Sequence, residues 1–96
     1  MSNAETKMIR NPNFIFRKIV DEMVLVPVKQ DVADLNAIFT LNDLGAFIWE
    51  KLEHPRSHAE LEDAIFAEYD TDIITVKRDL EKFLHEMAEI GAINEA

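Results

Sequence analysis

The spacing of the apolar residues changes at Leu41, and this change constrains the fold more than any other feature of the sequence. Before Leu41, β-branched and aromatic residues form two short runs, Phe14–Val20 and Met23–Val28, which are typical of strands. From Leu41 onward, apolar residues recur three and four positions apart, as they do on one face of a helix. A chain of 96 residues with this pattern is expected to form one domain in which strands precede helices.

Three strands are predicted in the first part of the chain. Asp21 and Glu22 separate the first two runs and suit a tight hairpin turn. Pro27 lacks an amide hydrogen, so it is expected to end the pairing of the second strand or to lie at a bulge. A third strand is predicted over Leu35–Thr40. Three strands of this length do not close into a barrel, so at least one edge of the sheet stays open.

Three helices are predicted in the second part, with lengths of about 12, 12 and 17 residues. Asn42 is a good N-cap for the first helix, and Ser57 with Glu60 forms a capping-box pair at the second. Asp72 can cap the third helix, and Gly91 suits the position after its end. The predicted fold is therefore α+β and winged helix-turn-helix-like, with a three-stranded antiparallel sheet followed by three helices.

The sequence divides into a tail and one domain. Residues 1–11 are assigned to an N-terminal tail, in which Ser2, Asn3 and Ala4 are either a purification-tag remnant or native sequence. Residues 12–94 form the predicted domain.

The charge of the chain excludes several classes of function. Ten Lys and Arg residues against 19 Asp and Glu give a net charge of −9, and the whole excess lies in residues 41–96. Such a charge disfavours generic binding to nucleic acid or to anionic membranes. The absence of cysteine excludes disulfides and thiol catalysis. No apolar stretch is long enough to span a bilayer, and the chain is expected to be cytoplasmic.

The sequence gives little support for a catalytic function. His54 and His58 have i, i+4 spacing, but Pro55 between them breaks the helix that would bring them to one metal-binding face. His85 lies beside the apolar stripe of the third helix and is expected at the surface. Two glycines cannot form a phosphate-binding loop. The expectation is a protein that is not an enzyme and that uses no metal or cofactor.

The run from Leu41 to Leu52 resembles the hallmark of the PqqD-like family, Leu-Asn-x-x-Gly-x-x-Ile-Trp-x-x-Leu. The resemblance extends upstream through Val24–Pro27 and downstream through Leu61–Asp70 and Val76–Leu84, and it covers roughly residues 12–94. It implies a bacterial peptide-recognition element for natural product biosynthesis. Such an element binds the leader of a ribosomally made precursor peptide and presents it to a modifying enzyme, often a radical S-adenosylmethionine enzyme.

The resemblance also implies where the leader binds. In the family, the leader adds as an extra strand to the third strand and packs against the third helix, a mode called β-augmentation. Carried over to this sequence, the strand edge comprises Asp34, Leu35, Asn36, Ala37, Ile38 and Phe39, and the helix wall comprises Lys77, Leu80, Glu81 and Leu84.

Two other functions are left open by the sequence. The winged-helix order alone is compatible with a DNA-binding regulator, although the cations Lys77, Arg78 and Lys82 are surrounded by acidic residues. The open sheet edge is also compatible with a structural domain that associates with itself as a homodimer.

Trp49 and Phe66 each lie one position off a helix stripe, where they either widen the core or form an aromatic patch for a partner.

Overall fold

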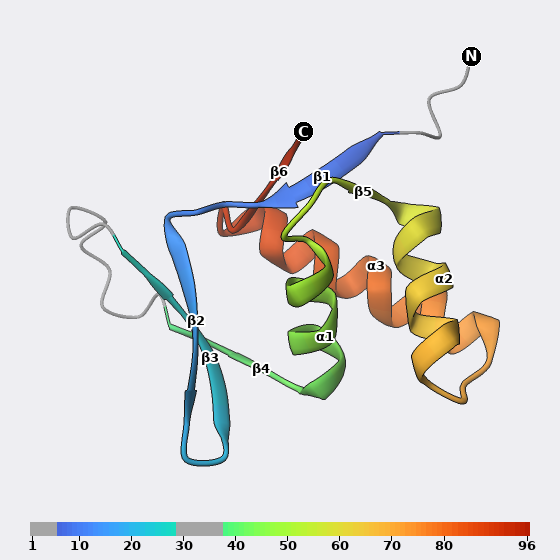
Figure 1. The fold of residues 1–96 in the computed structure, drawn as a ribbon, viewed down its shortest axis with the longest axis horizontal. Coiled ribbons are helices and arrows are strands. Elements are labelled where there is room, and N and C mark those ends of the chain that lie inside the picture. Colours follow the sequence, from blue (N-terminus) through green and yellow to red (C-terminus); the bar gives the residue numbers. More distant parts are fainter. Residues whose placement is uncertain (1–5, 29–37) are drawn as a thin grey trace.

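The computed structural model describes residues 6–28 and 38–96. Its first sheet has the order β2-β3-β4, with β2 at Phe14–Ile19, β3 at Glu22–Pro27 and β4 at Phe39–Leu41 (Figure 1). All neighbouring strands are antiparallel. The predicted three-stranded sheet is therefore confirmed. Of the predicted third strand, the part before Ile38 lies outside the described residues.

Three helices follow this sheet: α1 at Asp43–Lys51, α2 at His58–Glu68 and α3 at Ile73–Glu89. All three predicted caps are present, because the side chains of Asn42, Ser57 and Asp72 accept hydrogen bonds from the first turns of α1, α2 and α3. Gly91 follows α3 with a φ of 79°, which glycine adopts without strain. The predicted α+β fold is confirmed.

A second three-stranded sheet, with the order β5-β1-β6, joins the two ends of the chain. It contains β1 at Lys7–Arg10, β5 at Arg56–Ser57 and β6 at Ile93–Glu95, and lies above α1 in Figure 1. These strands were not predicted from the sequence, because they are only two to four residues long and pair with partners far away along the chain. Residues 7–10, assigned above to the tail, are part of this sheet.

The hairpin between β2 and β3 turns one residue earlier than the sequence suggests. Ile19 pairs with Glu22, so the loop consists of Val20 and Asp21 instead of Asp21 and Glu22. Val20 has a φ of 57°, a left-handed conformation that a β-branched residue adopts at a cost. The continuous register from Phe14 to Ile19 fixes the turn at this position despite the unsuitable residue.

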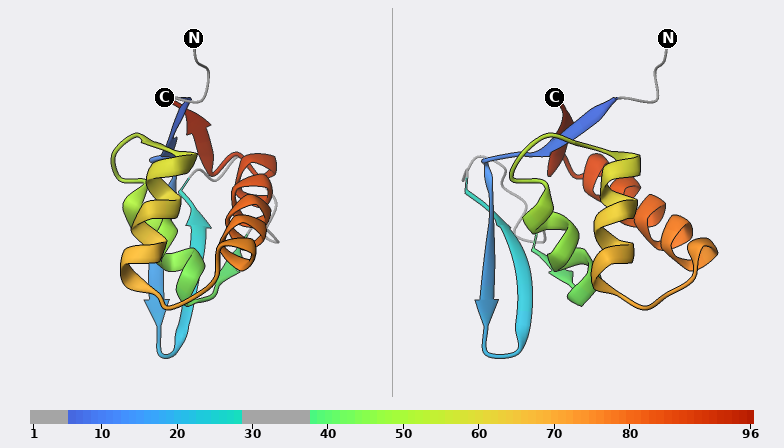
Figure 2. Two further views of the ribbon diagram at one scale, coloured as in Figure 1. Left: turned by 90° about the vertical axis from the view of Figure 1, so that its right-hand side faces the viewer. Right: turned by 45° about the vertical axis from the view of Figure 1, so that its right-hand side comes forward.

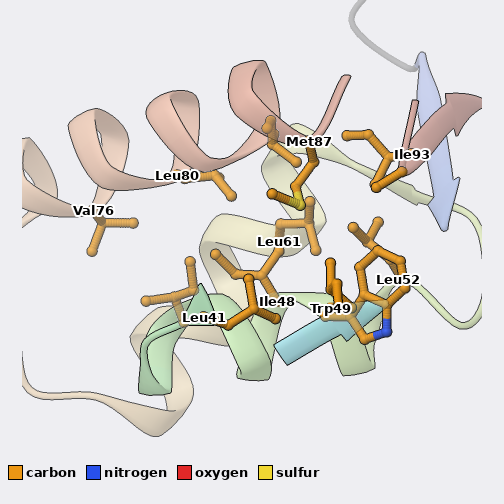
Figure 3. Packing of buried hydrophobic residues seen from close by; sticks show 13 residues of the cluster. Leu41, Ile48, Trp49, Leu52, Leu61, Val76, Leu80, Met87 and Ile93 are labelled. Carbon is orange, nitrogen blue, oxygen red and sulfur yellow. The ribbon is translucent and has the colours of Figure 1, made fainter. Parts of the chain in front are cut away.

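The hydrophobic core lies between β3 and the three helices. Figure 3 shows Leu80 and Met87 of α3 near Ile48 of α1 and Leu61 of α2, all buried. Of the two aromatic residues beside the helix stripes, Trp49 is buried and widens the core, whereas Phe66 is exposed. Buried apolar surface of this kind supplies most of the stability of a small domain.

Two helix caps make stability depend on pH. The pKa of Glu60 is lowered chiefly because its side chain accepts a hydrogen bond from the Ser57 N–H, and the pKa of Asp72 chiefly because it accepts one from the Thr75 N–H. Stability from these caps is therefore complete above the usual carboxyl pKa and is lost as pH falls through the lowered values. In urea titrations from about pH 6 to pH 3, the double variant Glu60→Gln/Asp72→Asn is expected to lose less stability than the parent chain. An equal loss would contradict this account.

Candidate functional site

β4 is an edge strand. The sheet order places it beside β3 alone within the described part of the chain. A free strand edge presents backbone N–H and C=O groups that can pair with another strand. The free groups of β4 can be identified from the pairing pattern of the whole sheet.

One backbone hydrogen bond between the ends of β2 and β3 fixes which pairs of the sheet are hydrogen-bonded. The Val28 N–H donates to the Asn13 carbonyl oxygen at 2.7 Å, so these two residues form a hydrogen-bonded pair. In an antiparallel ladder, hydrogen-bonded and non-hydrogen-bonded pairs alternate. Counting along the register, Val24 and Arg17 also form a hydrogen-bonded pair. Val24 therefore directs its backbone groups toward β2 and away from β4.

The same alternation continues into β4. Thr40 lies opposite Val24, so their pair is not hydrogen-bonded, and the N–H and C=O of Thr40 point away from β3. Phe39 and Leu41, on either side, direct their backbone groups toward β3. Ile38 precedes the strand, and its side chain is 56% exposed. Thr40 is therefore the residue of β4 whose backbone is available to an added strand.

A groove of about 230 Å³ lies beside this edge, between β4 and α3. Leu44 contributes apolar surface to it and Phe83 contributes an aromatic ring, while the buried side chains of Ile48 and Met87 line it from the core side. Asp79 and Glu86 place two carboxylates on its α3 wall, and Lys82 places one ammonium group there. The complete lining is Phe39, Thr40, Leu41, Asn42, Leu44, Gly45, Ile48, Asp79, Lys82, Phe83, Glu86 and Met87. The arrangement suits an extended peptide that pairs with β4 and inserts an apolar side chain.

The Leu41–Leu52 motif builds one end of this groove. Asn42 Oδ1 accepts a hydrogen bond of 2.8 Å from the Gly45 N–H and caps α1. A Cβ atom on Gly45 would lie 3.1 Å from Cε1 of Phe83, so glycine allows the ring to lie against the first turn of α1. Leu41 and Ile48 are buried in the core. The motif thus fixes both the end of β4 and the position of an aromatic ring in the groove.

Gly45→Ala is expected to affect peptide binding more than stability. The added methyl group pushes the Phe83 ring toward the groove, while alanine favours a helix by about 0.5–1 kcal/mol over glycine. We expect the free energy of unfolding to change by less than about 1 kcal/mol, and the dissociation constant of a groove-bound peptide to rise several-fold. Calorimetry and urea titration on the same samples measure both. Unchanged peptide affinity would contradict this role for Gly45.

The structure separates the residues that the resemblance assigned to the binding site. Ile38 and Phe39 lie at β4, while Asp34–Ala37 lie outside the described residues. Leu80 and Leu84 are buried in the core, with 0% and 8% of their surface exposed. These two side chains therefore hold α3 in place and present little surface to a ligand.

Lys77 and Glu81 lie on another part of α3. Lys77 Nζ is 3.2 Å from Glu62 Oε2 on α2, which draws its side chain toward α2. Glu81 is one turn further along the same side of α3 and is exposed. The exposed and half-buried residues of α3 that line the groove are instead Asp79, Lys82, Phe83 and Glu86, which were not predicted from the sequence. Their i, i+3, i+4, i+7 spacing beside the core stripe was the available signal.

The perturbed ionisable groups have structural causes. Besides the two caps, burial raises the pKa of Tyr69, with a further contribution from the carboxylates of Asp43 and Glu68. Among the described residues, His, Asp and Glu form no group of three or more that could hold a metal ion. His58 is the first residue of α2, and its Nδ1 lies 3.1 Å from Glu62 Oε2. In the same part of the chain, no helix is both long and apolar enough to cross a membrane.

Fold and groove together define a small α+β domain with an open strand edge beside its third helix. The chain belongs to the PqqD family: residues 22–93 match the family described as Coenzyme PQQ synthesis protein D (PqqD). This confirms the resemblance drawn from the Leu41–Leu52 motif. A search of curated proteins found no match.

Two solved structures are similar to this chain. The first is TbiB1 in complex with the TbiA(beta) leader peptide, with 32% sequence identity and a TM-score of 0.70, covering 90% of this chain and 94% of that one. The second is lasso peptide synthetase B1 complexed with the leader peptide, with 21% identity and a TM-score of 0.68, covering 91% and 96%. The second comparison supports the fold alone.

Proposed function

We propose that this protein binds the leader of a ribosomally made precursor peptide and presents it to a peptide-modifying enzyme. The observation that carries the proposal is the free Thr40 edge of β4 beside a groove on α3 that combines an aromatic ring with charged side chains. The 32% identity to TbiB1, solved with a leader peptide, supports the same assignment. The leader adds to β4 as a strand, with backbone hydrogen bonds providing affinity and the groove providing register.

The proposed binding site contains residues that were predicted from the sequence and residues that line the groove in the structure. On the strand side it retains the edge from Asp34 to Phe39 and adds Thr40. On the helix side it comprises Asp79, Lys82, Phe83 and Glu86. An apolar leader side chain occupies the groove, and the two carboxylates favour a leader with a basic residue nearby. Leu80 and Leu84 support this wall from the core.

The proposed role involves binding alone, without catalysis or a cofactor. The partner enzyme is expected to be of the radical S-adenosylmethionine type or another peptide-modifying enzyme, as the family resemblance implies. We place the protein in the cytoplasm, where ribosomally made peptides arise.

Titration calorimetry tests the function directly. The leader segment of the precursor encoded beside this gene is expected to bind with a dissociation constant of about 10 μM or lower, whereas a scrambled peptide of the same composition is not. Lack of binding by the leader at tens of micromolar would contradict the proposal. A sequence-selective gel shift at physiological salt would instead support the DNA-binding alternative.

A further inference from the structure

A second and larger cleft lies at the opposite edge of the same sheet. It has a volume of about 1020 Å³ and lies between β2 and α1, with Pro12 and part of β1 at one end. The right-hand view of Figure 2 shows the β2–β3 hairpin standing beside α1 on this side of the molecule. β2 is the other edge strand of the order β2-β3-β4, so this cleft and the leader groove lie at opposite edges.

The cleft presents apolar surface that the fold itself leaves uncovered. Ile15 and Phe16 of β2 line it and are 42% and 37% exposed. Phe47 and Tyr69 form its other side, with their rings edge-to-face and their centroids 5.4 Å apart. Phe14 also lines the cleft and packs against the core. A concave, largely apolar surface with a few polar groups is typical of binding sites.

Charged residues around the cleft indicate the chemistry of its occupant. Asp43, Glu50 and Glu53 line it with three carboxylates. The cation in the lining is Arg10, whose Nη1 donates to the Trp49 carbonyl oxygen at 3.3 Å and whose guanidinium lies over the Trp49 ring. Lys51 lies nearby, with Nζ 5.1 Å from the centroid of the Phe47 ring. The surface therefore complements a segment that is both apolar and basic.

We infer that the β2–α1 cleft binds an apolar, basic segment of the peptide-modifying enzyme while the leader occupies β4. This inference rests on the proposed function, since presentation requires one surface for the leader and another for the enzyme. The sheet provides both at its two edges. A second copy of this chain is disfavoured as the occupant, because each copy carries a net charge of −9.

Calorimetry with the purified modifying enzyme encoded beside this gene tests the inference. With leader bound, Glu50→Gln/Glu53→Gln is expected to weaken enzyme binding about fivefold or more, and Phe16→Ser about tenfold. The matched control Glu81→Gln/Glu89→Gln removes two exposed carboxylates away from the cleft and is expected to change binding less than about twofold. Equal effects of the two double variants, or no effect of either, would overturn the inference.

A synthetic probe tests the proposed chemistry separately. A 15N NMR titration compares a peptide of leucine and lysine at helical spacing, about 14 residues long, with its leucine–glutamate counterpart. The lysine peptide is expected to shift the resonances of Ile15, Phe16 and Glu50, and the glutamate peptide is not. Shifts centred on β4 and α3, or equal shifts with both peptides, would overturn the inference.

Two further measurements separate this inference from the proposed function. Leader affinity of the cleft variants is expected to equal that of the parent chain, so loss of enzyme binding with leader binding intact supports the inference. Absence of leader binding by the parent chain would instead contradict the proposed function.

Sedimentation is expected to show a monomer, and a dimer abolished by Phe16→Ser would make a second copy the occupant and overturn the inference.

Discussion

Replacing Thr40 with proline is expected to weaken leader binding about tenfold or more. The backbone N–H of Thr40 points away from β3, and proline removes this donor without removing a hydrogen bond between β3 and β4. A net backbone hydrogen bond contributes about 0.5–1.5 kcal/mol, and 1.4 kcal/mol corresponds to a tenfold change in affinity. The pyrrolidine ring also obstructs an approaching strand. Calorimetry with the leader peptide measures the effect.

Thr40→Val is the matched control for this experiment. Valine keeps the backbone N–H and the branched shape of threonine but removes its hydroxyl group. We expect the leader affinity of Thr40→Val to stay within about threefold of the parent chain, because strand addition relies on the backbone. Equal affinities of the proline and valine variants, with both proteins folded, would contradict pairing at Thr40.

Replacing Leu80 with alanine is expected to lower the free energy of unfolding by about 2–5 kcal/mol, the usual cost of a leucine-to-alanine change in a core. The Leu80 side chain is completely buried in the core cluster, so the substitution leaves a cavity between the helices (Figure 3). A loss of this size is a large fraction of the stability of a small domain. Urea titration monitored by Trp49 fluorescence measures it.

Glu81→Gln, one position along the helix, provides the comparison. Glu81 is exposed, and the change is expected to alter stability by less than about 0.5 kcal/mol. Both variants are also titrated with leader below the onset of unfolding. A small effect of Leu80→Ala on stability, together with a large effect on leader affinity, would show that Leu80 contacts the leader and would contradict its structural role.

The local features of the fold could be predicted because they are encoded in neighbouring residues. Asn42, Ser57 and Asp72 cap the helices through bonds to residues three positions away. Gly45 belongs to the family motif, and the structure explains its presence by the close approach of Phe83. Such short-range patterns survive in almost any tertiary context.

The second sheet could not be predicted because its strands depend on distant partners. Met8 pairs with Arg56 on one side and with Glu95 on the other. Strands this short carry no alternating pattern of their own, and tertiary context decides their conformation. The hairpin turn at Val20 is a similar case, because strand register outweighed the preference of the turn residues.

Only part of the helix wall of the binding site could be predicted from the sequence. The apolar spacing of α3 identifies the buried stripe that contains Leu80 and Leu84, but not which flank faces β4. The position of α2 decides this, because Lys77 pairs with Glu62 and occupies the flank on that side. The other flank, with Phe83, is left to form the groove.

Amide hydrogen exchange tests strand addition at β4 most directly. In the 15N-labelled protein with excess leader peptide, exchange of the Thr40 N–H is expected to slow about tenfold or more, because the leader accepts its hydrogen bond. Phe16 and Lys18, whose N–H groups point outward from β2 by the same alternation, are expected to exchange at unchanged rates. Unchanged exchange at Thr40, or slowing at Phe16 and Lys18 in its place, would contradict leader binding at β4.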